Sequence, residues 1–162
     1  MKPIKIFSIL LMLCLGIATV ATAQPAAVKK AANTTFTLTT FDAKGSILST
    51  SNGVFVSNNG ICVSTWKPFV GAMKAEVTDN NGQKYSVETI LGANELYDVA
   101  KFKITAKTNA ALFAPSVVAN SAAWIVMPSQ AGAPIKANID KVEKFMTKYN
   151  YCVLSTTASE KY

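Results

Sequence analysis

The stretch "ICVSTWKPFVGA" at residues 61–72 brings a hydroxyl and an amine close together, because Ser64 precedes Lys67 by three residues. The chain contains no histidine, so serine chemistry here would need the lysine as its base. A Ser–Lys pair requires an unprotonated amine in a dry pocket, with oxyanion donors beside it. No run of glycines accompanies Ser64. We therefore interpret Lys67 as a structural or surface residue.

The neighbours of Lys67 favour the same interpretation. Pro68 removes a backbone donor and fixes φ just past the apolar run. Large aromatic side chains at strand ends are usually buried, so we expect Trp66 and Phe69 to pack into the core. The alternative is an aromatic platform for a ligand.

Residues 1–23 predict a secretory signal peptide. Lys2 and Lys5 make a basic start, an apolar run follows, and "ATA" at 21–23 places small residues where a signal peptidase acts. We expect cleavage before Gln24 and an exported chain, either periplasmic or secreted.

Two kinds of membrane anchor are weaker interpretations of the same residues. Ser8 and Gly16 interrupt the apolar run, which falls short of the roughly 20 residues that a spanning helix needs. A lipid anchor on Cys14 is disfavoured because Leu13 stands where a small residue is expected. We expect no stable membrane insertion after cleavage.

The charge of the chain argues against nucleic-acid binding. Cleavage removes two lysines and lowers the net charge from +7 to +5, and every positive charge is a lysine. Arginine supplies the forked donor that usually contacts phosphates and guanine edges. We therefore expect a solvated basic surface and no nucleic-acid partner.

The cysteines of the chain predict no metal site, and we expect no cofactor. Cys62 and Cys152 remain after cleavage, and an exported pair could form a disulfide. Cys62 lies inside the apolar run "ICV", where a small buried thiol is the favoured interpretation. Without histidine or a CxxC pair, no zinc site can be assembled from recognisable ligands.

Short β-rich runs separated by turn residues begin near residue 34. The predicted strands include "TFTLTTF", "SILST", "VFVS", "ICVST", "KAEVTD", "QKYSVETIL" and "VAKFKIT". Asn-Gly pairs at 58–60 and 80–82 predict hairpins, because both residue types accept positive φ. "SNG" at 51–53 predicts a further turn. This spacing indicates an antiparallel barrel or sandwich.

The remainder of the chain predicts a second β unit. Residues 106–121 have weak periodicity and are interpreted as a connector, and "AAWIVMP" at 122–128 as a buried strand. Residues 132–156 are ambiguous, since some apolar positions fall at helical spacing whereas "IKANI" and "YCVLST" look extended. We favour a pair of strands over a helix.

Residues 45–104 as a block resemble the first barrel of trypsin-like serine peptidases of the Deg, or high-temperature-requirement, type. The resemblance lies in "GSILSTSNGVFVSNNGICVSTWKPFVGA" and "EVTDNNGQKYSVETILGANELYDVAKFKI". In that family a glycine-flanked strand, a "hydrophobic-x-T-x-x-H-V" segment, a "D-G" hairpin and a "D-hydrophobic-A" strand follow at these intervals. The resemblance implies an all-β, chymotrypsin-like fold with a six-stranded antiparallel barrel.

The resemblance also assigns site positions. The family aspartate, which holds the histidine's tautomer, falls on Asp98 in "YDVAKFKI", and the family histidine falls on Lys67. A lysine ammonium is no general base unless burial removes its proton. The expected consequence is a Lys67–Asp98 ion pair in place of a catalytic couple.

The serine of the family lies on a "G-[ND]-S-G-G"-like turn, and no serine of this chain is followed by glycine. The expected organisation is a signal peptide (1–23), an N-terminal linker (24–33), a first trypsin-like barrel (34–105), a connector (106–121) and a partial second β lobe (122–162). This predicts an exported, trypsin-like protein that is inactive as a serine endopeptidase.

The alternative is a non-enzymatic exported β-barrel that serves as a binding or scaffold module. Its incomplete second lobe would present strand edges to a protein or peptide partner. Unpaired apolar strands of this kind also favour self-association.

Overall fold

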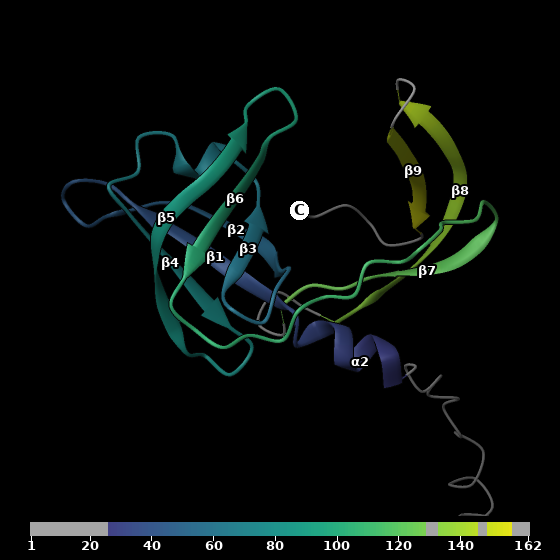
Figure 1. Ribbon diagram of the computed structural model, residues 1–162, viewed down its shortest axis with the longest axis horizontal. Coiled ribbons are helices and arrows are strands. Elements are labelled where there is room, and N and C mark those ends of the chain that lie inside the picture. Colours follow the sequence, from purple (N-terminus) through teal and green to yellow (C-terminus); the bar gives the residue numbers. More distant parts are fainter. Residues whose placement is uncertain (1–25, 129–132, 146–148, 157–162) are drawn as a thin grey trace, which may run out of the picture.

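The computed structural model describes residues 26–128, 133–145 and 149–156 (Figure 1). Within these residues are a closed β-barrel, a separate three-stranded sheet and one α-helix, α2 (Ala26–Ala32), which lies below the barrel in Figure 1. The helix occupies residues that the sequence analysis treats as a linker. It has no acidic residue in its first turn and buries Val28.

Six strands form the barrel, which closes in the order β1-β2-β3-β6-β5-β4 with every neighbouring pair antiparallel. The strands are β1 (Thr35–Phe41), β2 (Ile47–Phe55), β3 (Ile61–Ser64), β4 (Lys74–Asp79), β5 (Lys84–Asn94) and β6 (Val99–Ile104). The predicted six-stranded antiparallel barrel is therefore confirmed.

The barrel interior is filled by alternate residues of its strands. On β6, Ala100, Phe102 and Ile104 are fully buried while the residues between them are exposed. Phe36 of β1 meets Phe102 with ring centroids 6.0 Å apart. Because side chains alternate between faces with a period of two, this pattern fixes which face of each strand points inward.

Strand β2 differs from the prediction, because the expected turn at 51–53 lies inside it. Ser51 pairs with Leu38 and Gly53 pairs with Phe36 of β1. A Cβ on Gly53 would overlap the Phe36 ring and the Val63 carbonyl oxygen. The glycine therefore allows a ring and a neighbouring backbone to approach this strand closely, which is a common role of glycine inside strands.

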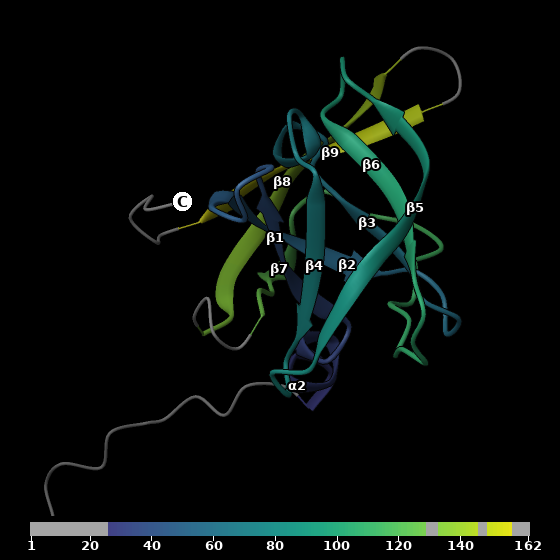
Figure 2. The same cartoon turned by 90° about the vertical axis from the view of Figure 1, so that its left-hand side faces the viewer.

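The second unit is a sheet of three antiparallel strands in the order β7-β8-β9. Its strands are β7 (Ser121–Ile125), β8 (Ile135–Phe145) and β9 (Tyr149–Thr156). The favoured prediction of two strands within 132–156 is thus confirmed. Figures 1 and 2 both place this sheet to one side of the barrel, behind it in the second view.

The connector begins against the barrel. The Ala111 N–H donates to the Phe55 carbonyl at 2.8 Å, and the Thr108 hydroxyl donates to the Ser57 carbonyl at 2.6 Å. These bonds tie the first part of the connector to the end of β2 and the turn that follows it.

Candidate functional site

The turn that carries Lys67 is a single 3₁₀ turn, η1 (Lys67–Phe69), which follows β3. Its two i+3 bonds run from the Phe69 N–H to the Trp66 carbonyl at 2.9 Å and from the Val70 N–H to the Lys67 carbonyl at 3.1 Å. Pro68 is buried within it. The first N–H groups of such a turn have no partner inside it.

Asp98 supplies the missing partner from a different part of the chain. Its Oδ1 atom accepts hydrogen bonds from the Trp66 N–H at 2.9 Å and the Lys67 N–H at 2.7 Å. Pro68 has no N–H to offer. One carboxylate oxygen therefore satisfies both donors at the N-terminal end of the turn, where a negative charge is also favoured by the peptide dipoles.

The backbone of Asp98 is adapted to this contact. Its φ is 49°, a left-handed conformation that aspartate tolerates better than most residues. The Asp98 N–H donates to the Glu95 carbonyl at 3.2 Å, and the Tyr97 N–H donates to Asn94 Oδ1 at 3.0 Å. The β5–β6 turn thus holds the carboxylate toward η1.

The Lys67 side chain takes no part in this contact. Lys67 is exposed, and the ion pairs found within the described residues are Lys74–Glu76 at 2.7 Å and Lys141–Glu143 at 2.6 Å. The expected Lys67–Asp98 ion pair is therefore wrong. The structure does bring the two residues together, but through the lysine's backbone, which a carboxylate can bind whatever the side chain is.

The aromatic residues on either side of this turn are packed as predicted. Trp66 and Phe69 stack with ring centroids 6.1 Å apart, and Phe69 meets Phe102 edge-on at 5.2 Å. Both are partly buried against the barrel core. The prediction that they pack into the core is confirmed, and together they anchor η1 over the end of the barrel.

Ser64 is turned away from Lys67 by its own hydrogen bonds. It is buried, and its hydroxyl donates to the Asn52 carbonyl at 2.8 Å and lies 3.2 Å from the Ser51 hydroxyl. A serine directed at the neighbouring strand is in no position to form a Ser–Lys pair. The interpretation of Lys67 as a structural or surface residue agrees with this geometry.

Cys62 is a buried, unpaired thiol at the centre of the barrel. Burial raises the pKa of its thiol from 9.0 to about 12, so the group stays protonated at neutral pH and is a poor nucleophile. The disulfide alternative does not hold for Cys62. The Cys152 side chain lies outside the described residues.

The residues that the structure describes contain no metal cluster and no membrane-spanning helix. Within them, His, Cys, Asp and Glu side chains form no group of three or more that could hold a metal ion. Within the same residues, no helix has the length and apolar character needed to cross a membrane.

The closed six-stranded barrel followed by a second β sheet is a chymotrypsin-like fold. Among solved structures, the chain is similar to the serine endoprotease from Yersinia pestis, with a TM-score of 0.60 and 16% sequence identity. The similarity covers 74% of this chain and 46% of the endoprotease chain. No protein-family model and no curated protein sequence matches.

This similarity shows the fold. The sequence resemblance to trypsin-like peptidases therefore holds at the level of a protease-like fold. Because this chain spans about half of the endoprotease chain, the activity of the whole enzyme does not carry over.

Proposed function

We propose that this chain is an exported protein with a trypsin-like peptidase fold that does not hydrolyse peptide bonds and acts instead by binding. One observation carries the proposal. The carboxylate at the family's aspartate position, Asp98, contacts the backbone of residue 67, and that residue is a lysine with an exposed side chain.

The family's histidine has two tasks in hydrolysis. An imidazole both takes the serine proton and passes it to the leaving group. An ammonium in contact with water holds its proton and cannot act as a general base. Lys67 therefore cannot replace the imidazole in this position, and the core thiol of Cys62 offers no other nucleophile.

The test is an assay of the purified chain with casein and with a chromogenic ester, using trypsin as a positive control. We expect no turnover above the blank. Turnover that a serine-directed inhibitor abolishes would overturn the proposal.

The basic start, apolar run and "ATA" of residues 1–23, which predict a signal peptide, support export. We expect N-terminal sequencing of the chain recovered from a bacterial periplasm or culture medium to begin at Gln24. Recovery of the uncleaved chain from the cytoplasm would contradict this part of the proposal.

A binding role is favoured by the second sheet. Within the described residues, β7 and β9 each pair with β8 and leave their other edge without a strand neighbour. A free edge offers a row of backbone donors and acceptors to an extended peptide. Leu154 of β9 is also exposed.

A peptide or protein partner that adds a strand there would be detected by protection of β7 or β9 amides from hydrogen exchange. Self-association through the same edges would protect those amides as the concentration of the chain alone rises. Amide protection confined to the barrel would exclude both partner binding and self-association through the edges of β7 and β9.

A further inference from the structure

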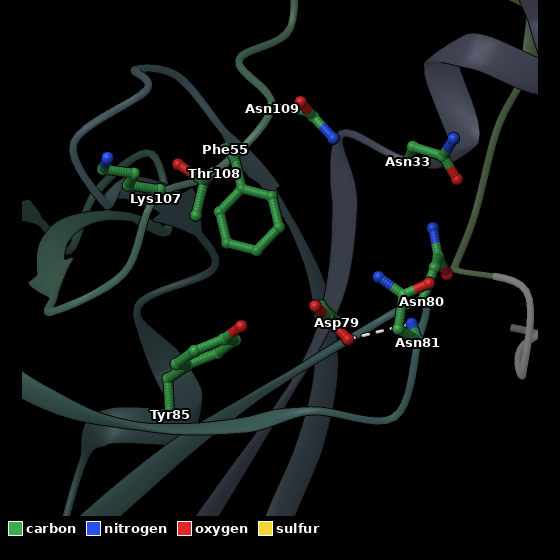
Figure 3. A pocket seen from close by; sticks show the side chains of 9 residues that line it. All are labelled: Asn33, Phe55, Asp79, Asn80, Asn81, Tyr85, Lys107, Thr108 and Asn109. Carbon is green, nitrogen blue, oxygen red and sulfur yellow. Dashed lines mark hydrogen bonds between the residues drawn. The ribbon is translucent and has the colours of Figure 1, made fainter.

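A polar pocket of about 270 Å³ lies between the barrel, the end of α2 and the start of the connector. Figure 3 shows the side chains that line it, with the Phe55 ring near the middle of the view. The lining residues are Asn33, Phe55, Asp79, Asn80, Asn81, Tyr85, Lys107, Thr108 and Asn109. Four of the eight polar residues carry a side-chain amide.

The pocket is at the opposite end of the barrel from Lys67 and Asp98. Strand β4 runs from η1 to Asp79, and β6 runs from Asp98 toward Lys107. The two strands therefore start beside the Asp98 contact and end at the pocket. A ligand here would act independently of the peptidase-like site.

Hydrogen bonds hold two of the three walls in place. Asp79 Oδ1 accepts from the Asn81 N–H at 2.8 Å and the Gln83 N–H at 2.9 Å, which fixes the β4–β5 turn. The bond to Asn81 is the dashed line in Figure 3. On the connector side, the Ala110 N–H donates to Asn58 Oδ1 at 3.1 Å.

The third wall is joined to the barrel by a further bond. The Asn80 side-chain amide donates to the Ala32 carbonyl at the end of α2. Segments far apart in the sequence are thus fixed around one space. A pocket formed before the ligand arrives lowers the ordering cost of binding.

The side chains that face this space suit hydroxyl groups. Asn33, Asn81 and Asn109 make no side-chain hydrogen bond within the described residues, and each amide offers both a donor and an acceptor. A hydroxyl needs the same combination. Burial, followed by the charge of Asp79 and a hydrogen bond to it, raises the pKa of Tyr85, so its phenol stays neutral.

The charges in the pocket favour a neutral ligand. Asp79 and Lys107 carry one charge of each sign, and in Figure 3 the lysine ammonium points away from the other side chains. An anion would meet the Asp79 carboxylate, and a cation would compete with the Asn81 and Gln83 N–H groups and the Tyr85 hydroxyl, which already bind that carboxylate. Neither kind of ion has a matched set of partners.

We propose that this pocket binds one unit of a neutral, polyhydroxylated ligand, that is, a saccharide. Its volume is close to the lower end of the range of about 300–1,000 Å³ that small-molecule sites occupy. That size suits a single ring, with further units outside.

The experiment is a titration of the full chain, labelled with ¹⁵N, with D-glucose, N-acetyl-D-glucosamine and myo-inositol. We expect at least one probe to shift the side-chain amide signals of Asn33, Asn81 and Asn109. Asn33→Ala and Asn109→Ala should each weaken binding about 2- to 10-fold, the equivalent of one neutral hydrogen bond. Asn138→Ala, an exposed position on β8, is the matched control and should change nothing.

Two results would overturn the proposal. If none of the three probes at 50 mM shifts the side-chain amide signals of Asn33, Asn81 and Asn109, a saccharide site is excluded. This result is read on the natural chain and does not depend on how the variants fold. Tighter binding of inorganic phosphate than of every neutral probe, lost in Lys107→Ala, would identify an anion site instead.

Discussion

Asp98 Oδ1 lies 2.7 Å from the backbone nitrogen of Lys67. These two residues are 31 positions apart in the chain, and the same oxygen also binds the Trp66 N–H. In a trypsin-like peptidase an aspartate binds an imidazole N–H. Here one oxygen of the aspartate caps a 3₁₀ turn by accepting from two backbone N–H groups.

Replacing the Asp98 carboxylate should destabilise the protein. Asp98→Ala leaves the partly buried Trp66 N–H and the exposed Lys67 N–H without this acceptor, and we expect a loss of about 1–2 kcal/mol in the free energy of unfolding. Asp98→Asn keeps one acceptor oxygen and should lose less. Urea denaturation of the three proteins measures both values, and equal stability of all three would show that the cap is unimportant.

The side chain of Lys67 should not contribute to this stabilisation. Because Asp98 binds the lysine's backbone, Lys67→Met leaves the contact intact, and we expect a change within about 0.5 kcal/mol. A double-mutant cycle with Asp98→Ala should therefore be additive. A coupling above about 1 kcal/mol would reveal an ion pair that forms in solution.

Restoring the histidine should not restore hydrolysis. Lys67→His supplies an imidazole beside η1 that the second Asp98 oxygen can bind, but Ser64 stays bonded to the Asn52 carbonyl and is directed at the neighbouring strand. We expect the variant to fold and to leave casein uncleaved. Cleavage that appears only in Lys67→His would mean that another serine reaches this position.

The strands were predictable because their pattern is local. "TFTLTTF" coincides with β1 and "KAEVTD" with β4, since alternating apolar residues and flanking Asn-Gly turns determine them within a few residues. The prediction failed at 51–53, where the two predicted strands on either side continue as the single strand β2 and Gly53 pairs with Phe36.

The contact between Asp98 and η1 could not be predicted from the residues alone. The resemblance placed Asp98 near residue 67, but it suggested a bond between side chains. What decides the contact is the left-handed φ of Asp98 and the unpaired N–H groups ahead of Pro68. The asparagines of the polar pocket are scattered over three loops. Their spacing in the sequence therefore does not predict that they line one pocket.

Gly60 should be far less replaceable than Gly45. Both have positive φ, 84° and 80°, so an alanine is strained by about 1–2 kcal/mol at either position. A Cβ at Gly45 meets nothing within 4 Å, whereas at Gly60 it would overlap the Ile104 carbonyl oxygen. We expect Gly60→Ala to cost about 1–3 kcal/mol more than Gly45→Ala in urea denaturation. Equal costs would contradict the packing of β6 against this turn.

Cys62 should make the stability of the barrel fall at high pH. Burial raises the pKa of its thiol from 9.0 to about 12 in the folded state. The unfolded chain therefore releases the proton first, and this contribution to stability is complete below pH 9 and lost as the pH rises toward 12. Lysines and tyrosines also titrate in this pH range. The effect of Cys62 must therefore be measured as the difference in stability between two proteins that differ only at this residue.

The difference is taken between the natural chain and Cys62→Ala, both in a background with Cys14 and Cys152 replaced by serine. Cys62→Ala is expected to be less stable at pH 8, because it leaves a cavity in the core. The gap in unfolding free energy between the two proteins should narrow from pH 9 upward, since only the thiol gains from ionising when the chain unfolds. A gap that stays constant to pH 11 would show that Cys62 ionises as easily in the folded protein as in the unfolded one, and that water reaches the centre of the barrel.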